Sequence, residues 1–473
     1  MSLTVDQSAE KIHSLVNDDG FLGHNRNDHV KQVAEIFKQA SAADSNAIAA
    51  KLSDDDLREL AGDVNSGGIL GTQGLSGGEK RDLFNELARE LDGTQLGRVA
   101  SAFSDRSDVL ALGDAVAGFA PSQTKVDFVK SIAGRATDRS TDIDSGFGYN
   151  SLRTGDKEAQ AIGSVLSSMK NDPAGFDAAV KALTPDQLAA VVKAGEGEKI
   201  TTYSGMGGVS APQTTYDPAG LHSMLEAAAG SHDPAVKARV FEAATKALDD
   251  IRGSDTLLTP NPGAKDAAKV VADGLTKLMD SDTRGIVDQL NTNDIGGRAL
   301  AKYVGELVSE DGSASNPVLG RQIAQLQGAG TGKTATEFIN TAEKSSNGDN
   351  FYRNAENLGY YAGAIEAGIN KLNADDKTKG EILTNIFTTV VGAGTAAVTK
   401  MPTAGKVASQ VFNGITREVV RQVVADVSSD RKDLRQALTE LTLPRDPGQT
   451  QRSRSPADPY YQSSANTVVL ANQ

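Results

Sequence analysis

The sequence predicts a mostly α-helical protein built from stacked helical hairpins. In the stretch Ala178–Ala194 one helix ends near Leu183 and the next begins, because Thr184 can cap it, Pro185 suits its first position and Gln187 completes a capping box. The same kind of corner recurs at Leu52–Leu57, Leu91–Leu96, Leu290–Ile295 and Leu372–Lys377. The corners are irregularly spaced, so we expect stacked hairpins and not a solenoid of fixed period.

The composition agrees with this fold class. A chain of 473 residues can bury several cores. It is 38% apolar and 5% aromatic, has no Trp, and contains 48 Gly. We therefore expect cores of Ala, Leu and Val in which helices approach closely.

Charge and cysteine content narrow the function classes. A net charge of −14 argues against nucleic acid as a partner, because binding to phosphates depends on Lys and Arg. Without Cys the chain has no disulfide, thiolate nucleophile or Cys-type zinc site. The N-terminal residues lack the basic and apolar regions of a Sec signal. We expect a protein that is secreted without a Sec signal, or is cytoplasmic before export.

Residues 1–135 are expected to form an N-terminal helical domain. Val30, Val33 and Phe37 fall on one helical face, and Ser76 with Glu79 forms a capping box after a Gly-rich turn. The polar, aperiodic residues 136–157 are expected to be a linker.

No metal site is expected in this linker or among the histidines. Asp142 and Asp144 alternate as calcium ligands do, but Ser140 stands where the loop's first ligand is needed and the final Glu is missing. His24 and His29 are five residues apart and so do not share a helical face.

Residues 158–310 are expected to form a central helical domain. Within it, residues 200–216 contain two Thr-Thr-Tyr segments around a Gly-rich tip, which predicts a small exposed β-hairpin. Tyr203, Met206 and Tyr216 could make this hairpin a recognition loop. The alternative is a connector in which Thr and Tyr simply favour strand.

Residues 311–350 are expected to be a linker with a Gly-rich segment. Gly328–Thr334, GAGTGKT, has the glycines, Lys and hydroxyl of a phosphate-binding loop. However, Gln327 stands where the full motif has Gly, and a polar helical pattern precedes it instead of a buried strand. We interpret the segment as a Gly-rich helix terminus and predict no nucleotide or other cofactor.

Residues 351–443 are expected to form a C-terminal helical hairpin bundle, and the Pro-containing residues 444–473 a disordered tail. Ile382–Thr399 is uncharged over eighteen residues, close to the length that spans a bilayer. It is either the central helix of a bundle or half of a membrane hairpin over 382–415. The hairpin's apolar positions would be Ile382, Ile386, Val390, Val411 and Ile415.

Two blocks resemble a known class of proteins. Leu57–Phe103, with LSGGEKRDLFNELARELDG, and Leu358–Leu372, LGYYAGAIEAGINKL, are similar to helical regions of large secreted bacterial effector and polymorphic-toxin proteins. The resemblance implies a carrier or delivery module. Its motifs are capping and packing motifs, so no catalytic residue can be transferred from it.

Taken together, these features predict a non-catalytic secreted effector or delivery protein that binds a protein partner, either secretion machinery or a target-cell protein. Two alternatives remain at this point. One is a pore-forming toxin that inserts residues 382–415, the sole expected membrane contact. The other is an enzyme whose active site is dispersed along the chain, although no catalytic residue can be named.

Overall fold

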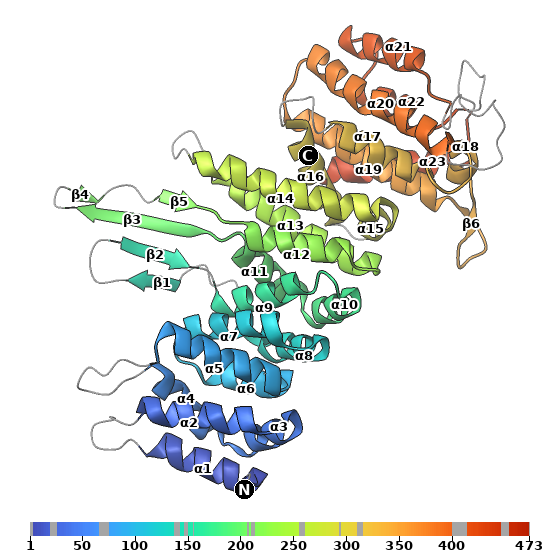
Figure 1. Ribbon diagram of the computed structural model, residues 1–473. Coiled ribbons are helices and arrows are strands. Elements are labelled where there is room, and N and C mark those ends of the chain that lie inside the picture. Colours follow the sequence, from blue (N-terminus) through green and yellow to red (C-terminus); the bar gives the residue numbers. More distant parts are fainter. Residues whose placement is uncertain are drawn as a thin grey trace. The chain divides into compact units, whose positions relative to one another are not determined.

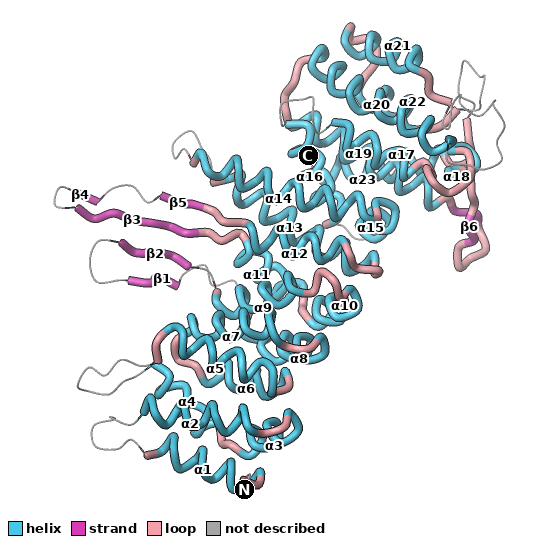
Figure 2. Tube along the Cα trace, in the orientation of Figure 1, coloured by secondary structure: helices cyan, strands magenta, loops and turns pink. Residues whose placement is uncertain are grey.

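A computed structural model describes residues 3–18, 26–65, 75–136, 142–145, 150–154, 156–205, 208–209, 213–254, 261–292, 295–309, 316–399, 414–445 and 454–472. These residues form twenty-three α-helices and seven short strands, which confirms the mostly α-helical fold (Figure 2). The chain divides into two compact units. Unit 1 comprises Met1–Val236 and Asp250–Gly274, and unit 2 comprises Lys237–Asp249 and Leu275–Gln473.

Unit 1 is a stack of helical hairpins in two layers (Figure 1). In each layer, every helix packs on the next member. The first layer contains α2 (Arg26–Gln39), α5 (Gly77–Glu90), α7 (Arg106–Phe119), α9 (Lys157–Ser168) and α12 (Ala219–Ala229). The second layer contains α4 (Asp54–Asn65), α6 (Gly93–Ala102), α8 (Ser122–Ile132) and α10 (Pro173–Ala182).

The remaining helices of unit 1 extend the same arrangement. The helix α1 (Val5–Asn17) packs on α2, α4 and α3 (Ala42–Lys51), while α11 (Pro185–Gly195) packs on α9 and α12. A short 3₁₀ helix, η2 (Ala133–Arg135), follows α8. Each hairpin buries its apolar side chains against the next hairpin. A single amphipathic hairpin would lack these contacts and would not be stable alone.

Most of the predicted caps are present. Thr184 with Gln187 and Ser76 with Glu79 both form complete capping boxes. The caps predicted at Asn291 and Asn373 are wrong, and Asn291 instead follows α15 (Thr283–Leu290) as its C-cap. Asn373 instead has a φ of 48°, and Asp375 accepts the hydrogen bond from the Thr378 amide at 2.8 Å. The residue just before the helix can reach the first free amides, whereas Asn373 lies too far upstream.

A five-stranded antiparallel sheet lies to one side of the unit 1 helices (Figure 1). Its strands are β1 (Asp142–Ser145), β2 (Asn150–Thr154), β3 (Lys199–Gly205), β4 (Gly208–Val209) and β5 (Gln213–Thr215). The order is β1-β2-β3, and β3 also pairs with β4 and β5.

The sheet confirms the hairpin predicted at 200–216 and corrects the linker predicted at 136–157. The supposed linker contributes β1 and β2, and Arg153 of β2 lies opposite Ile200 of β3. Pairing with β3 satisfies the backbone of this polar segment, so it forms strands without the apolar alternation that would have signalled them.

Unit 2 is organised around α19 (Arg353–Lys371), which is buried along most of its length. This helix packs on α15 (Thr283–Leu290), α16 (Gly296–Ser309), α17 (Asn316–Leu326), α18 (Ala335–Ile339), α22 (Leu434–Thr442) and α23 (Asp458–Ala471). The helix α20 (Asp376–Thr399) packs on α17 and α21 (Arg417–Ser428), and β6 (Glu343–Lys344) pairs with β7 (Asn350–Phe351). The residues of α13 (Pro234–Gly253) and α14 (Pro262–Ser281) are divided between the two units.

The prediction of a disordered tail over 444–473 is wrong for residues 458–471, because they form α23, which packs against α19. Pro459 lies in the first turn of α23, where its missing amide hydrogen costs nothing. Tyr461 is fully buried, and its hydroxyl hydrogen-bonds the Thr442 hydroxyl at 2.7 Å. Gly359 and Gly363 let the two backbones approach, since a Cβ there would lie 2.2 Å from the Tyr461 carbonyl and 2.5 Å from the Ala465 carbonyl.

We expect Gly359→Ala to destabilise unit 2 by about 1–3 kcal/mol, because α23 must move away from α19 to admit the methyl group. Gly305→Ala in α16 is the control, since its new Cβ would have no neighbour closer than 3.8 Å. It should gain about 0.5–1 kcal/mol from the lost flexibility of glycine. Scanning calorimetry of the full chain measures both variants, and equal melting temperatures for the two would contradict the close α19–α23 packing.

Candidate functional site

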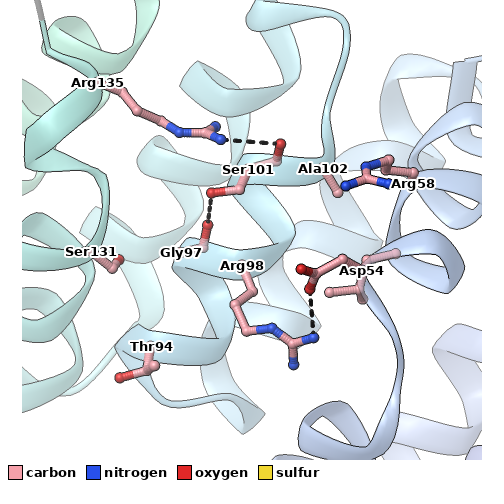
Figure 3. Close-up of a pocket in the computed structure, with 10 residues that line it drawn as sticks. Asp54, Arg58, Thr94, Gly97, Arg98, Ser101, Ala102, Ser131 and Arg135 are labelled. Atoms are coloured by element: carbon pink, nitrogen blue, oxygen red, sulfur yellow. Dashed lines mark hydrogen bonds and ion pairs between the residues drawn. The ribbon is translucent and has the colours of Figure 1, made fainter.

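A polar groove of about 370 Å³ runs along one face of α6 in unit 1 (Figure 3). Its floor contains Thr94, Gly97, Arg98 and Ser101, which are spaced three or four residues apart and therefore share a helical face. Its remaining lining residues are Asp54, Leu57 and Arg58 of α4, Ala102 at the end of α6, Ser131 of α8 and Arg135 of η2. We call this feature the α6 groove.

The groove is bounded on one side by close packing of α6 on α8. A Cβ on Gly97 would lie 2.0 Å from the Ser131 hydroxyl oxygen, so this position accepts no side chain. The Ser131 hydroxyl donates to the carbonyls of Phe128 at 2.7 Å and Gly93 at 3.2 Å. The Ser101 hydroxyl donates to the Gly97 carbonyl at 2.7 Å. These hydroxyl donors are therefore used within the fold.

Arg98 has a structural task. Its guanidinium donates to the carbonyls of Ala49 at 3.0 Å and Leu52 at 2.9 Å, which lie at the end of α3. It also donates to the Asp54 carboxylate at 2.8 Å, and this hydrogen bond lowers the pKa of Asp54. Arg98 thus fixes the turn between α3 and α4.

Arg58 and Arg135 are much less committed. Arg58 pairs with its neighbour Asp55, and its side chain is 65% exposed. Arg135 donates one long hydrogen bond of 3.4 Å to the Ser101 carbonyl. Both side chains extend toward the C-terminal end of α6 from opposite walls (Figure 3). Exposed, weakly held guanidinium groups can exchange their present partners for a ligand at little cost.

The charge of the groove is opposite to that of the whole protein. Three Arg side chains and one Asp line the groove, whereas the chain carries a net charge of −14. Arg58, Arg98 and Arg135 come from separate helices and are distant in sequence, so sequence reasoning did not bring them together. The feature of the sequence that could have indicated a groove on α6 is the spacing of small residues, three to four positions apart, from Thr94 to Ser101.

The structure places the predicted recognition residues in different settings. Tyr203 belongs to β3, opposite Asn150 of β2. Tyr216 follows β5 and is half-buried. Burial raises its pKa, while a hydrogen bond with Ser254 opposes that shift. Met206 lies outside the described residues. Tyr216 therefore belongs to the base of the sheet and not to its tip.

The apolar residues of the predicted membrane hairpin are buried in unit 2. Ile382, Ile386 and Val390 of α20 and Ile415 before α21 are all at most 5% exposed. Val411 lies outside the described residues. Within the part of the chain that the structure describes, no helix combines the length and the apolar character needed to cross a bilayer.

The Gly-rich segment joins two helices. Gly328, Gly330 and Gly332 have φ values of 93°, 85° and 80°, which suit glycine. The Lys333 amine hydrogen-bonds the Thr341 hydroxyl at 3.4 Å, and Thr334 caps the five-residue α18 with Glu337. The element before the segment is α17 and not a strand, so the geometry of a phosphate-binding loop is missing here.

Ser, Asp and His side chains meet at one place in unit 1, but not in a catalytic order. Asp56 lies between the other two, 2.6 Å from the His13 ring nitrogen and 2.7 Å from the Ser53 hydroxyl. In a triad the His must bridge Ser and Asp. This Asp instead completes the capping box of α4. In the described residues, no group of three or more His, Asp or Glu side chains is placed to hold a metal ion.

Comparison of the chain with protein-family models and with curated proteins yields no match.

We expect Arg98→Met to destabilise unit 1 by about 1–3 kcal/mol, because it keeps the aliphatic stem but removes the hydrogen bonds to the end of α3. Arg81→Met, at an exposed position on α5, should change stability by less than about 0.5 kcal/mol. Urea unfolding followed by circular dichroism compares the two. Equal stabilities would show that Arg98 does not hold the α3–α4 turn.

Val390→Asp should destabilise unit 2 by several kcal/mol, because a charge at a fully buried position of α20 must lose its water. Thr388→Asp is the matched control, since position 388 is exposed on the same helix. Thermal melts measure both variants. A Val390→Asp protein that melts normally but no longer releases dye from acidified anionic vesicles would instead support the pore-forming alternative.

Proposed function

We propose that this chain is a non-catalytic interaction protein of the secreted bacterial effector or delivery type, which binds an acidic segment of a partner protein in the α6 groove. The observation that carries the proposal is the concentration of three guanidinium groups in one groove of an acidic chain. Electrostatic complementarity of this kind selects partners and speeds encounter more than it adds affinity.

The dimensions of the groove favour a short peptide segment. Thr94 to Ala102 are nine residues of helix, and the eight steps between them correspond to about 12 Å. An extended chain advances about 3.3 Å per residue, so roughly three or four partner residues fit along the floor. Arg58 and Arg135 would bind carboxylates from the two walls, and Arg98 would contribute charge while it stays bound to α3.

The charge balance favours carboxylates on a folded or extended protein over a long polyanion. Guanidinium groups match carboxylates well because two parallel N–H donors face two oxygens. Nucleic acid would bring many phosphates against a surface whose net charge is −14. An acidic segment of limited length gains the local attraction and avoids most of that repulsion.

The resemblance to effector carrier regions supports the same proposal. Most residues that line the groove belong to the block Leu57–Phe103, including Arg58, Arg98 and Ser101. The groove thus lies in the part of the chain that is similar to delivery modules. A stack of hairpins is also an effective scaffold for binding, because it presents grooves between successive helices on a rigid support.

We expect the full chain to bind a fluorescein-labelled hexaglutamate peptide at low ionic strength, as measured by fluorescence anisotropy. The double variant Arg58→Glu, Arg135→Glu should weaken binding at least about tenfold, because it replaces two attractive contacts by two repulsive ones. Binding should also weaken as salt is added, since the groups are exposed.

Arg81→Glu is the control for each single charge reversal, Arg58→Glu or Arg135→Glu, because it makes the same change of charge at an exposed site on α5, outside the groove. It should keep the affinity within about twofold. A hexaglutamine peptide should not bind. The proposal fails if hexaglutamate does not bind, or if Arg81→Glu weakens binding as much as the groove variants.

A further inference from the structure

A charge cluster around one buried carboxyl group, that of Glu196, lies where the β-sheet leaves the helices of unit 1. The Lys193 amine near the end of α11 is 2.8 Å from the Glu196 carboxylate, 3.5 Å from Asp250 and 3.8 Å from Glu198. The Glu196 side chain is 0% exposed. Its Oε1 has no hydrogen-bond partner among the residues that the structure describes.

This cluster is next to the joint between the sheet and the helices. Gly197 has a φ of 61°, and a Cβ there would lie 2.3 Å from the Asp217 carbonyl oxygen. The Asp217 amide donates to the carbonyls of Glu196 at 3.1 Å and Gly197 at 3.2 Å. The strand β3 begins at Lys199, two residues after Gly197, and β5 ends at Thr215, two residues before Asp217. The hydrogen bonds from the Asp217 amide to Glu196 and Gly197 thus join the start of β3 to the end of β5, and we call this junction the base of the sheet.

The cluster contains more negative than positive groups. Among the side chains that the structure describes, Lys193 is the one cation that faces Glu196, while Glu198 beside it, Asp250 of α13 and the Tyr216 hydroxyl also act on it. With every carboxyl ionised, Lys193 and its three acids carry a net charge of −2, and protonation of Glu196 reduces it to −1. Burial raises the pKa of Glu196 to about 8, although Lys193 opposes the shift.

We propose that Glu196 is a proton-dependent anchor, which holds the base of the β-sheet against the helices while its carboxyl group is protonated and weakens that attachment when the group is ionised. Ionised Glu196 would have a buried, charged oxygen without a donor, and water can reach it only if the base opens. Opening separates Glu196 and Gly197 from Asp217 and carries Tyr216 with β5. The inference is independent of the α6 groove and of its acidic ligand.

The pH range follows from the sign of the shift. When the base is open, the Glu196 carboxyl titrates near its ordinary value of about 4.3, and when the base is closed it titrates near 8. Between these values the open form releases a proton that the closed form keeps, so opening becomes more favourable as pH rises. Below this range both forms are protonated, and above it both are ionised, so the dependence levels off at each end.

Amide hydrogen exchange of the full chain tests the proposal, with rates corrected for the pH dependence of intrinsic exchange. Protection of amides in β3, β5 and Asp217 should fall at least about tenfold between about pH 6 and about pH 8. Amides of α6 serve as an internal reference and should keep their protection. Glu196→Gln keeps the shape but cannot ionise, so it should remove the pH dependence at the sheet.

Glu198→Gln is the control variant, because it removes a carboxyl from the same cluster at a side chain that is 27% exposed. It should retain the pH dependence. If Glu196→Gln does not fold, a carbon NMR titration of labelled Glu in the unaltered protein decides the matter. The proposal is overturned by constant protection at the sheet, by an unchanged dependence in Glu196→Gln, by an equal dependence in α6, or by titration of Glu196 near 4.3.

Discussion

The packing of both units depends on helices that approach each other where one of them has no side chain. In unit 1, a Cβ on Gly113 of α7 would lie 2.5 Å from the Ala161 methyl of α9, and Gly97 of α6 meets Ser131 of α8 in the same way. In unit 2, Gly359 and Gly363 admit the carbonyls of α23. A chain with 48 Gly and no Trp combines short distances between helices with buried Tyr and Phe side chains such as Tyr461. A glycine also contributes to the α6 groove. Gly97 adds no side chain to its floor, while Arg58 and Arg135 form its walls.

Local rules explain which parts of the fold could be predicted. A cap such as Thr184 with Gln187 involves residues three positions apart, so it is visible in the sequence and is present in the structure. The strands β1 and β2 could not be seen in the same way, because their polar residues form strands through pairing with β3, which is distant in sequence. The sequence did not indicate α23, because several Pro residues precede Pro459 of this helix and its amphipathic pattern is weak. Its burial depends on glycines of α19 about one hundred residues earlier. The arginines of the groove are likewise brought together only by the fold, since α4, α6 and η2 each contribute one.

The two charged regions of unit 1 are opposite in character. In the groove, cations outnumber anions and are mostly exposed, so each contact is weak and responds to added salt. At the base of the sheet, three carboxyls surround Lys193, and Glu196 is fully buried. Burial makes Glu196 sensitive to protonation and reduces the screening of its charge by salt. The overall charge of −14 indicates neither the cationic groove nor the acidic cluster, because both depend on where the fold places the charged side chains.

The difference between Arg98 and its two neighbours shows how one residue type serves structure and binding in the same groove. Arg98 makes short bonds to backbone carbonyls at the end of α3, and these acceptors would lose their partner if it turned toward a ligand. The present contact of Arg58 is exposed and that of Arg135 is long. A ligand carboxylate that displaces these contacts therefore costs little binding energy. Binding in the groove is therefore limited to the energy of two exposed charge pairs and the field of a third. Such a site is suited to reversible contact with an acidic segment, and a partner that binds tightly must also contact other surfaces of the hairpin stack.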